Sequence, residues 1–147
     1  MSLQFDRKNR NSTEENIVLS KNTSFAELRI LIVDDNPDII DSLSMLLRCW
    51  DVKVQAFNNG TSALTALDEF YPHIVLLDMG IPDIDGCNVA EKIRQNLQYA
   101  SIKLVALTGW NQETDRVKSK ASGFNEHLAK PVDISDLCKL LNKLIIE

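Results

Sequence analysis

From residue 28 onward, the chain alternates between short apolar runs and longer amphipathic segments. The apolar runs are rich in aliphatic and β-branched side chains, which favour β-strands, and they cover residues 29–33, 52–57, 73–77, 102–107 and 124–128. The segments between and after them have helical periodicity and cover residues 37–49, 60–70, 87–98, 111–121 and 133–145. The pattern therefore predicts five consecutive β-α units.

The predicted strands also indicate how the units are arranged. The first, third and fourth are almost entirely apolar, which is typical of parallel strands covered on both faces. Consecutive β-α units with right-handed crossovers place helices on both sides of one sheet. The pattern predicts an α/β fold, a three-layer doubly wound (βα)5 sandwich of the flavodoxin-like kind, but it does not give the order of the strands.

The first 26 residues differ from the rest of the chain. The run DRKNRNSTEEN is polar and has no periodicity, so we expect residues 1–26 to form a flexible arm or linker and residues 27–147 to form the folded domain. No apolar stretch approaches the ~18 residues that a membrane-spanning helix needs. The start of the chain does not resemble a signal peptide, and we expect a cytoplasmic protein that does not insert into membranes.

Polar side chains follow four of the apolar runs. Asp34 and Asp35 come directly after LRILIV, Asp78 follows HIVLL, Thr108 follows KLVAL, and Lys130 follows NEHLA. In an open parallel α/β sheet, functional groups gather in the crevice at the carboxyl ends of the strands. We therefore expect three carboxylates, one hydroxyl and one ammonium to meet at one edge of the sheet.

This group of side chains suits metal-assisted phosphoryl transfer. Carboxylates ~5 Å apart repel by roughly 3 kcal/mol per pair at an effective dielectric constant near 20. Mg²⁺, with Mn²⁺ as an alternative ion, would offset that repulsion through oxygen ligands. Asp78 can then act as a nucleophile that forms an aspartyl phosphate. Lys130 and Thr108 would contact the oxygens of the transferred group.

The composition narrows the range of functions. The net charge is −5 and no block of Lys and Arg stands out, so binding of nucleic acid by this chain alone is not expected. The sequence has neither a glycine-rich phosphate loop nor zinc-type spacing of Cys and His. Cys49, Cys87 and Cys138 are odd in number and far apart, which indicates small buried side chains in a reducing compartment.

Four motifs together resemble those of response-regulator receiver domains, the phospho-acceptor modules of two-component signalling. They are LIVDDN, LLDMGIPDIDG, LVALTG and HLAKPVD, and the resemblance covers about residues 28–146. The stretch LTGWNQETDR and the motif HLAKPVD look closest to receivers attached to hybrid sensor kinases. The chain is accordingly expected to be such a receiver or a stand-alone regulator.

The resemblance implies a strand order of 2-1-3-4-5 and a mechanism. A histidine kinase or histidine phosphotransfer protein would donate a phosphoryl group to Asp78, in a signalling step without enzymatic turnover. Asp35 and Asp78 would bind Mg²⁺ directly, Asp34 mainly through water, and the Gly80 backbone carbonyl would add a ligand. The Lys130–Pro131 peptide bond would be cis.

Three positions depart from the family pattern or flank the site. His127 stands where receivers often have Tyr or Phe, three residues before the lysine, so its imidazole is our candidate for the switching ring. Gly80 stands where a larger side chain is usual beside the phosphate, and Trp110 is the second residue after Thr108. We expect Gly80 and Trp110 to tune the lifetime of the aspartyl phosphate.

Two surfaces are candidates for partner contacts. The helix at 37–49 has more apolar residues than one face can bury, and we expect it to dock the phosphodonor through Ile40, Ser44 and Leu47 on an exposed side. The 111–121 segment offers few apolar residues to a core, so phosphorylation should shift it most easily. Residues 111–145 then form the expected output face, and a homodimer could use the same face.

Three other functions remain open at this point. An aspartyl-phosphate phosphatase or phosphotransferase would usually have a second acid two residues after its nucleophile, where this chain has Gly80. A receiver-like binding module that works without phosphorylation would be expected to lack an acid or the lysine. A flavodoxin-like electron carrier would require flavin.

Overall fold

The structure is a computed structural model that describes residues 25–81, 83–109 and 120–146. Residues 26–131 form a compact unit built on one five-stranded parallel sheet in the order β2-β1-β3-β4-β5. The strands are β1 (Arg29–Val33), β2 (Lys53–Phe57), β3 (Ile74–Asp78), β4 (Lys103–Thr108) and β5 (Glu126–Ala129). The α/β class and the 2-1-3-4-5 order are therefore confirmed.

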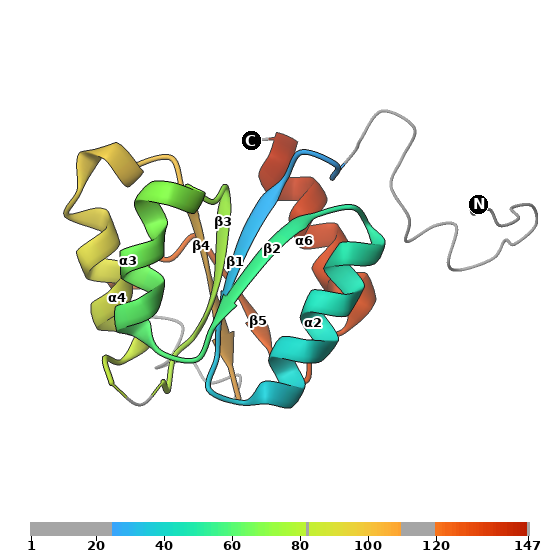
Figure 1. The fold of residues 1–147 in the computed structure, drawn as a ribbon, viewed down its shortest axis with the longest axis horizontal. Helices are drawn as coiled ribbons and strands as arrows, with labels where there is room; N and C mark the ends of the chain where they lie inside the picture. The colour runs from blue at the N-terminus through green and yellow to red at the C-terminus, as the bar shows by residue number, and fades with distance from the viewer. Residues whose placement is uncertain (1–24, 82, 110–119, 147) are drawn as a thin grey trace, which may run out of the picture. The chain divides into compact units, whose positions relative to one another are not determined.

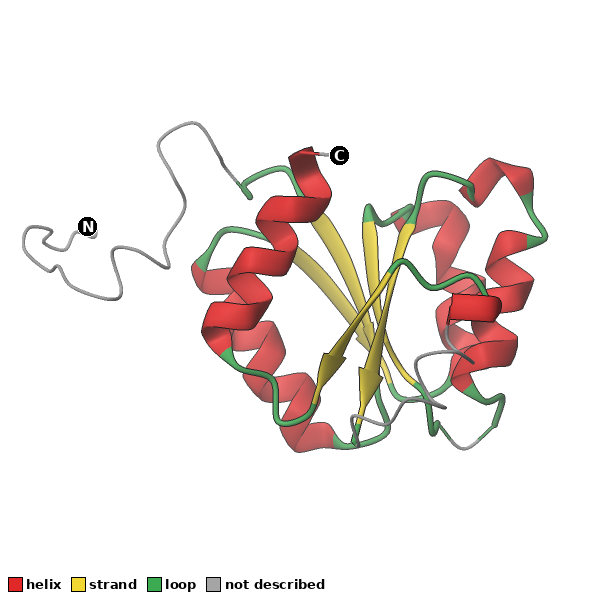
Figure 2. Cartoon of the chain, turned by 180° about the vertical axis from the view of Figure 1, so that it is seen from behind, coloured by secondary structure: helices red, strands yellow, loops and turns green. Residues whose placement is uncertain are grey.

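Helices lie on both faces of this sheet (Figures 1 and 2). Helices α3 (Gly60–Phe70) and α4 (Gly86–Arg94) cover one face, and α2 (Pro37–Cys49) lies on the other. Alternate strand residues point to the α3–α4 face, because side chains along a strand have a period of two. The core on that face contains Leu31, Val33, Val75, Leu77, Leu104 and Ala106 from the sheet, with Ala63, Leu67, Val89 and Ile93 from the helices.

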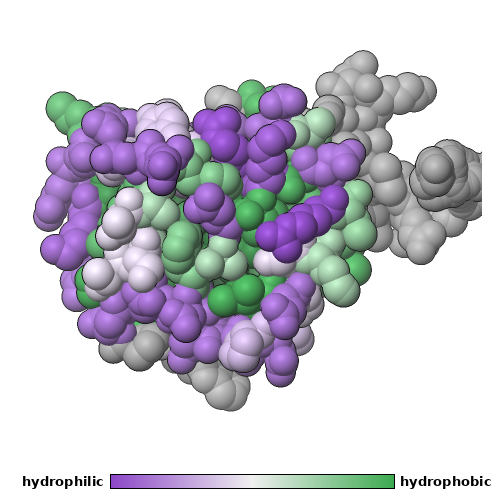
Figure 3. All heavy atoms as spheres, in the orientation of Figure 1, coloured by the Kyte–Doolittle hydropathy of each residue, from purple (hydrophilic) through white to green (hydrophobic). Residues whose placement is uncertain are grey.

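The edge strand β2 is less buried than the central strands of the sheet. Every residue of β3 is buried, whereas β2 is only half-buried and exposes Lys53 and Gln55. Figure 3, drawn in the orientation of Figure 1, shows hydrophilic and hydrophobic residues mixed on this face of the molecule. Polar side chains on an edge strand discourage pairing with a second sheet.

One predicted helix is shorter in the structure than in the sequence pattern. The expected helix at 87–98 ends at Arg94, and a short 3-10 helix, η1 (Leu97–Tyr99), follows it. The break occurs at Asn96, which is extended and whose side chain accepts a hydrogen bond from the Gln98 backbone N–H at 3.0 Å. Asparagine readily makes such local caps, and they compete with continued helix.

The C-terminal helix belongs to a second compact unit, which includes residues 132–147, and is described by itself. It is α6 (Ile134–Ile146), and its buried residues include Leu137, Leu141 and Leu144 at helical spacing. The expected helix at 111–121 lies outside the described residues except for Lys120 and Ala121, which are helical. Most of the expected N-terminal arm also lies outside them. Among the described helices, none has the length and apolar character to cross a membrane.

His73 joins β1 to the start of β3 at the amino ends of the strands. The Arg29 backbone N–H donates to His73 Nδ1 at 3.0 Å, and the His73 N–H donates to the Arg29 carbonyl at 2.9 Å. Burial, and then the positive charge of Arg29, lower the pKa of His73. The hydrogen bond at Nδ1 requires that nitrogen to be unprotonated.

We predict a pH dependence of stability from this histidine. Its folded-state pKa lies below its unfolded value of about 6.5, so its contribution is present above that pH and is lost as the pH falls through the folded-state pKa. The free energy of unfolding should therefore fall less between about pH 7 and pH 5 in His73→Gln than in the wild type. Urea unfolding at both pH values tests this, and equal pH dependence in the two proteins would contradict it.

Candidate functional site

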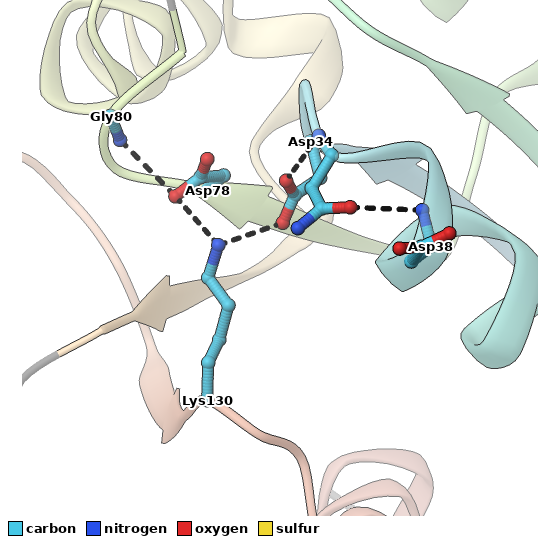
Figure 4. A network of polar contacts seen from close by, with 6 residues as sticks. Asp34, Asp38, Asp78, Gly80 and Lys130 are labelled. Carbon is cyan, nitrogen blue, oxygen red and sulfur yellow. Dashed lines mark hydrogen bonds and ion pairs between the residues drawn. The ribbon is translucent and has the colours of Figure 1, made fainter.

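Asp34, the first residue after β1, is fully buried. Its backbone N–H donates to the Phe57 carbonyl at 3.1 Å, which continues the pairing of β1 with β2. Its Oδ1 accepts from the Asn36 backbone N–H at 2.9 Å, and the Asn36 side chain caps α2 by accepting from the Asp38 N–H (Figure 4). The start of α2 therefore fixes the orientation of this carboxylate.

The Lys130 ammonium lies between Asp34 and Asp78 (Figure 4). Its Nζ is 2.9 Å from Asp34 Oδ2 and 3.2 Å from Asp78 Oδ1. The Lys130 backbone N–H donates to the Thr108 carbonyl at 2.7 Å, which fixes the residue beside the end of β4. Burial opposes the charge on Lys130, but the hydrogen bond to Asp34 and the negative charges of Asp78 and Asp34 raise its pKa overall.

Asp78 is the last residue of β3, and only 8% of its surface is exposed. The Gly80 backbone N–H donates to Asp78 Oδ1 at 3.2 Å, the same oxygen that faces Lys130. Burial raises the pKa of Asp78 and the charge of Asp34 adds to it, whereas the Gly80 N–H and Lys130 lower it without cancelling the rise. The ionised carboxylate is therefore less stabilised than that of an exposed aspartate.

The acidic side chains form a cluster that fits a divalent cation. Oxygen atoms of Asp34, Asp35 and Asp78 all lie within 4.8 Å of one another. Asp34 and Asp78 are buried, and Asp35 is exposed. Lys130 brings one positive charge to three acidic groups, so the charge is not balanced when all three are ionised. Oxygen donors with excess negative charge are the ligands that Mg²⁺ prefers.

Thr108, the last residue of β4, lies opposite Ala129 of β5 and is 5% exposed. Its Oγ1 is buried and has no hydrogen-bond partner in the described part of the chain. Such a group is uncommon in folded proteins. The residue lines a cavity of about 450 Å³ together with Asp78, Gly80 and Lys130. A hydroxyl in this position can donate to an oxygen of a ligand in the cavity.

The loop from β3 to α4 approaches the site closely. A Cβ atom at Gly86 would lie 2.7 Å from the Asp78 carbonyl oxygen and 2.7 Å from Met79 Cα, so this close packing requires a glycine. Asp85 caps α4 by accepting from the Asn88 N–H at 3.0 Å. The start of α4 is therefore held against the backbone of Asp78.

The remaining predicted site residues lie in different places. His127 is half-buried within β5, opposite Ala106. Gly80 is exposed, and a Cβ atom added to it would lie more than 4 Å from every heavy atom of the described residues outside its immediate chain neighbours. The Lys130–Pro131 peptide bond is cis, as the resemblance implied. Trp110 lies outside the described residues.

The prediction that Ser44 and Leu47 lie on an exposed side of the 37–49 helix is wrong. Ser44 is 5% exposed, Leu47 is fully buried, and Ile40 is half-buried. Residues at this spacing share one helical face, and that face is turned inward. The apolar stripe is too wide for its pattern alone to show which edge is covered. Met45, 64% exposed, is a large apolar residue that α2 presents to solvent.

The sequence did not identify every residue around the site. The further cavity-lining residues are Met79, Asp85, Cys87, Leu107 and Gly109. The Asp85-Gly86 pair was an available signal, because Asp before a helix commonly caps it and so locates the start of α4. Cys87 and Cys138 are buried, as predicted, but the prediction is wrong for Cys49, which is exposed at the end of α2. Cys87 also lines the cavity, which its position in the sequence does not reveal.

Comparisons with known proteins identify the family of this chain. The model of the response regulator receiver domain matches residues 30–142, and the chain belongs to this family. It is 31% identical to protein PilH of Pseudomonas aeruginosa over 117 residues, which cover 80% of this chain and 97% of PilH. It is 30% identical to the transcriptional regulator RpaA of Synechocystis over 80% of this chain, but this spans only 48% of RpaA.

Solved structures give the same result. The receiver domain of a Pseudomonas aeruginosa sensor histidine kinase, which has a magnesium ion coordinated in its active-site cleft, is 27% identical with a TM-score of 0.76. That match covers 83% of this chain and all of the other. A CheY-like receiver domain from Methanospirillum hungatei is 28% identical with a TM-score of 0.74, over 82% of this chain and 95% of that one. The chain is therefore a receiver domain of two-component signalling.

The charge cluster predicts how stability responds to substitution and metal. Because the pKa of Asp78 is higher in the folded state than in the unfolded state, the side chain favours folding when it is protonated. This contribution is fully present below the unfolded-state pKa and is lost as the pH rises through the folded-state pKa. At neutral pH, Asp78→Asn should therefore raise the free energy of unfolding in EDTA by about 1 kcal/mol. Mg²⁺ at tenfold its dissociation constant should add about 1.4 kcal/mol to the wild type, and less to the variant.

Urea unfolding of both proteins, in EDTA and in Mg²⁺, measures both effects. Ser44→Ala, a substitution on α2 away from the charge cluster, is the control and should gain as much from Mg²⁺ as the wild type. An Asp78→Asn variant that is less stable than the wild type in EDTA, or that gains equally from Mg²⁺, would contradict the interpretation.

Proposed function

We propose that this receiver domain is a Mg²⁺-dependent phospho-acceptor and that Asp78 takes the phosphoryl group. The observation that carries the proposal is the position of the Asp78 carboxylate. It lies 3.2 Å from the Lys130 ammonium, beside two further carboxylates, in a cavity that Thr108 also lines. The Thr108 hydroxyl has no hydrogen-bond partner among the residues that the structure describes. Proteins with this arrangement need little more than placement and charge to transfer a phosphoryl group.

The phosphodonor is a phosphohistidine of a histidine kinase or a histidine phosphotransfer protein. An Asp78 carboxylate oxygen attacks phosphorus, the P–N bond to the donor imidazole breaks, and the imidazole leaves with the bonding electrons and then takes up a proton. The product is an acyl phosphate on Asp78. The step consumes the acceptor once per event, so the domain acts as a signalling component and not as an enzyme with turnover.

The other site residues have distinct roles in this proposal. Lys130, released from part of its ion pairing, donates to one phosphoryl oxygen, and Thr108 donates to another. Asp34, Asp35, Asp78 and the Gly80 carbonyl would hold the metal ion. Bound there, Mg²⁺, or Mn²⁺ in its place, supplies positive charge that offsets the charge on the phosphoryl oxygens.

Phosphorylation replaces the single charge of the Asp78 carboxylate with a phosphoryl group that carries nearly two negative charges. Movement of Thr108 toward the new group would reposition His127, which lies on the neighbouring strand, opposite Ala106. We propose that the surface of residues 111–145 changes with it and is the output face, and that a homodimer would use this face. Ile40, half-buried on α2, remains our candidate for contact with the phosphodonor.

The likeness to PilH and to receiver domains of sensor kinases supports a cytoplasmic role in a phosphorelay, in a stand-alone regulator or as part of a hybrid sensor kinase. In this proposal, residues 27–147 of the chain form the receiver domain, and residues 1–26 form an arm or linker. The chain binds a partner protein and, by itself, no nucleic acid.

Intact-mass spectrometry after incubation with acetyl phosphate tests the proposal. We expect a single added phosphate on the wild type in Mg²⁺, and none in EDTA or on Asp78→Asn. Asp51→Asn is a matched control that changes an exposed aspartate in the turn between α2 and β2 and retains the acceptor Asp78, so it should still gain the adduct. A Mg²⁺-dependent adduct on Asp78→Asn would place the acceptor elsewhere. Turnover of a phosphomonoester would favour a phosphatase or phosphotransferase.

The space around Gly80 gives a second prediction. A Cβ atom added there has no heavy atom of the described residues within 4 Å, so we expect an asparagine to be accommodated. Gly80→Asn should therefore leave the free energy of unfolding within about 0.5 kcal/mol of the wild type. The lifetime of the aspartyl phosphate should nevertheless change, because the new side chain lies beside the acceptor. An unchanged lifetime in both Gly80→Asn and Trp110→Ala would contradict the proposal that these positions tune it.

A further inference from the structure

The loop between β3 and α4 is tied to a helix that contributes nothing directly to the site. Asp83, in this loop, accepts three hydrogen bonds from the first turn of α3. Its Oδ1 accepts from the Gly60 backbone N–H at 2.8 Å. Its Oδ2 accepts from the Thr61 backbone N–H at 3.0 Å and from the Thr61 hydroxyl at 2.6 Å. The sequence separation is more than 20 residues, so this is a contact between distant segments.

Two side chains, Asn59 and Asp83, accept hydrogen bonds from the backbone N–H groups in the first turn of α3. Asn59, the N-cap of α3, accepts from the Ser62 N–H at 2.8 Å and belongs to the helix itself. Asp83 satisfies the two preceding N–H groups from outside the helix, where a negative charge also interacts favourably with the helix dipole. The hydrogen bond from the Thr61 hydroxyl, and then those from the Gly60 and Thr61 N–H groups, hold the pKa of Asp83 well below its usual range.

The helix end of this contact is held firmly. Gly60 is buried, and a Cβ atom there would lie 2.8 Å from Val89 Cγ2 of α4 and 3.3 Å from Ile81 Cδ1. Ile81, itself 4% exposed, belongs to the core between the sheet and these helices. The hydrogen bonds of Asp83 therefore connect the loop to the first turn of α3, which is itself packed closely against α4 and Ile81.

Gly80, by contrast, has little that holds it. It has no side chain, and no heavy atom of the described residues lies within 4 Å of the position of a Cβ. Its backbone N–H donates to Asp78 Oδ1 at a long 3.2 Å. The loop is otherwise fastened at its ends, where the Met79 N–H donates to Leu107 and the Gly86 N–H donates to Met79. The path of the loop beyond Gly80 thus depends on Ile81 and on Asp83.

We propose that Asp83 is a positioning residue for the metal and phosphoryl site, which fixes the loop and thereby the Gly80 carbonyl. The inference rests on the proposed function, because it assumes that this carbonyl ligates Mg²⁺. Asp83 itself touches neither the metal nor the phosphoryl group. A consequence is that the first turn of α3, although outside the site, sets the affinity of the site for Mg²⁺.

Isothermal titration calorimetry with Mg²⁺ alone tests this on the full chain, in the wild type, Asp83→Ala and Asn59→Ala. Both variants remove a cap from the same turn of α3, but only Asp83→Ala releases the loop. We expect the Mg²⁺ dissociation constant to rise roughly three- to tenfold in Asp83→Ala, toward the lower end of the effects seen for outer-shell residues. In Asn59→Ala the dissociation constant should stay within about twofold of the wild type. The melting temperature in EDTA should fall in both variants, because each loses a cap of α3.

A second variant keeps the test independent of the folding of Asp83→Ala. Thr61→Val removes one of the three hydrogen bonds to Asp83 and should weaken Mg²⁺ binding by a smaller factor in the same direction. Wild-type affinity in Asp83→Ala, or an equal loss in Asp83→Ala and Asn59→Ala, would overturn the inference and leave the proposed function standing. A wild type that binds no Mg²⁺ would overturn the proposed function itself.

Discussion

The site depends on one shared cation, the Lys130 ammonium between the Asp34 and Asp78 carboxylates. Its Nζ lies 2.9 and 3.2 Å from oxygens of the two acids, and all three side chains are largely removed from solvent. Two buried carboxylates this close are tolerated only with compensating charge. Lys130 compensates incompletely, since Asp35 adds a third acid to the cluster and the pKa of Asp78 stays raised, with burial as the largest cause. The remaining imbalance favours binding of a further cation.

The fold brings these groups together through the order of its strands. β1 and β3 are neighbours in the sheet, so Asp34 and Asp78 end adjacent strands although 44 residues separate them. β4 and β5 then follow on the same side and bring Thr108 and Lys130 to the same edge. The connecting segments refine this placement, because α2 is capped through Asn36 beside Asp34 and α4 starts against the backbone of Asp78. The burial of the central strands β1, β3 and β4 thus offsets the electrostatic cost of the site.

The sequence predicted the class of fold and the five polar groups of the site, because apolar strands and the residues that follow them are local signals. It did not predict which face of α2 is covered, and Ser44 and Leu47 proved to be buried, since a wide apolar stripe fits the sheet in more than one rotation. It placed the end of the 87–98 helix too late, because the Asn96 cap competes locally with helix. The contact of Asp83 with α3 joins segments that no periodicity relates. Such contacts depend on how loops meet in three dimensions.

A crystal structure of the protein with Mg²⁺ and beryllofluoride, an analogue of the phosphoryl group, would test whether Asp78 is the phospho-acceptor. Beryllium should be bound to a carboxylate oxygen of Asp78, with fluorine atoms in contact with Lys130 and Thr108 and the metal held by Asp35 and Asp78. In that complex Lys130 should no longer bridge Asp34 and Asp78 as it does here. An adduct on another residue, or a Mg²⁺-bound site in which Asp78 stays free of beryllofluoride and paired with Lys130, would contradict it.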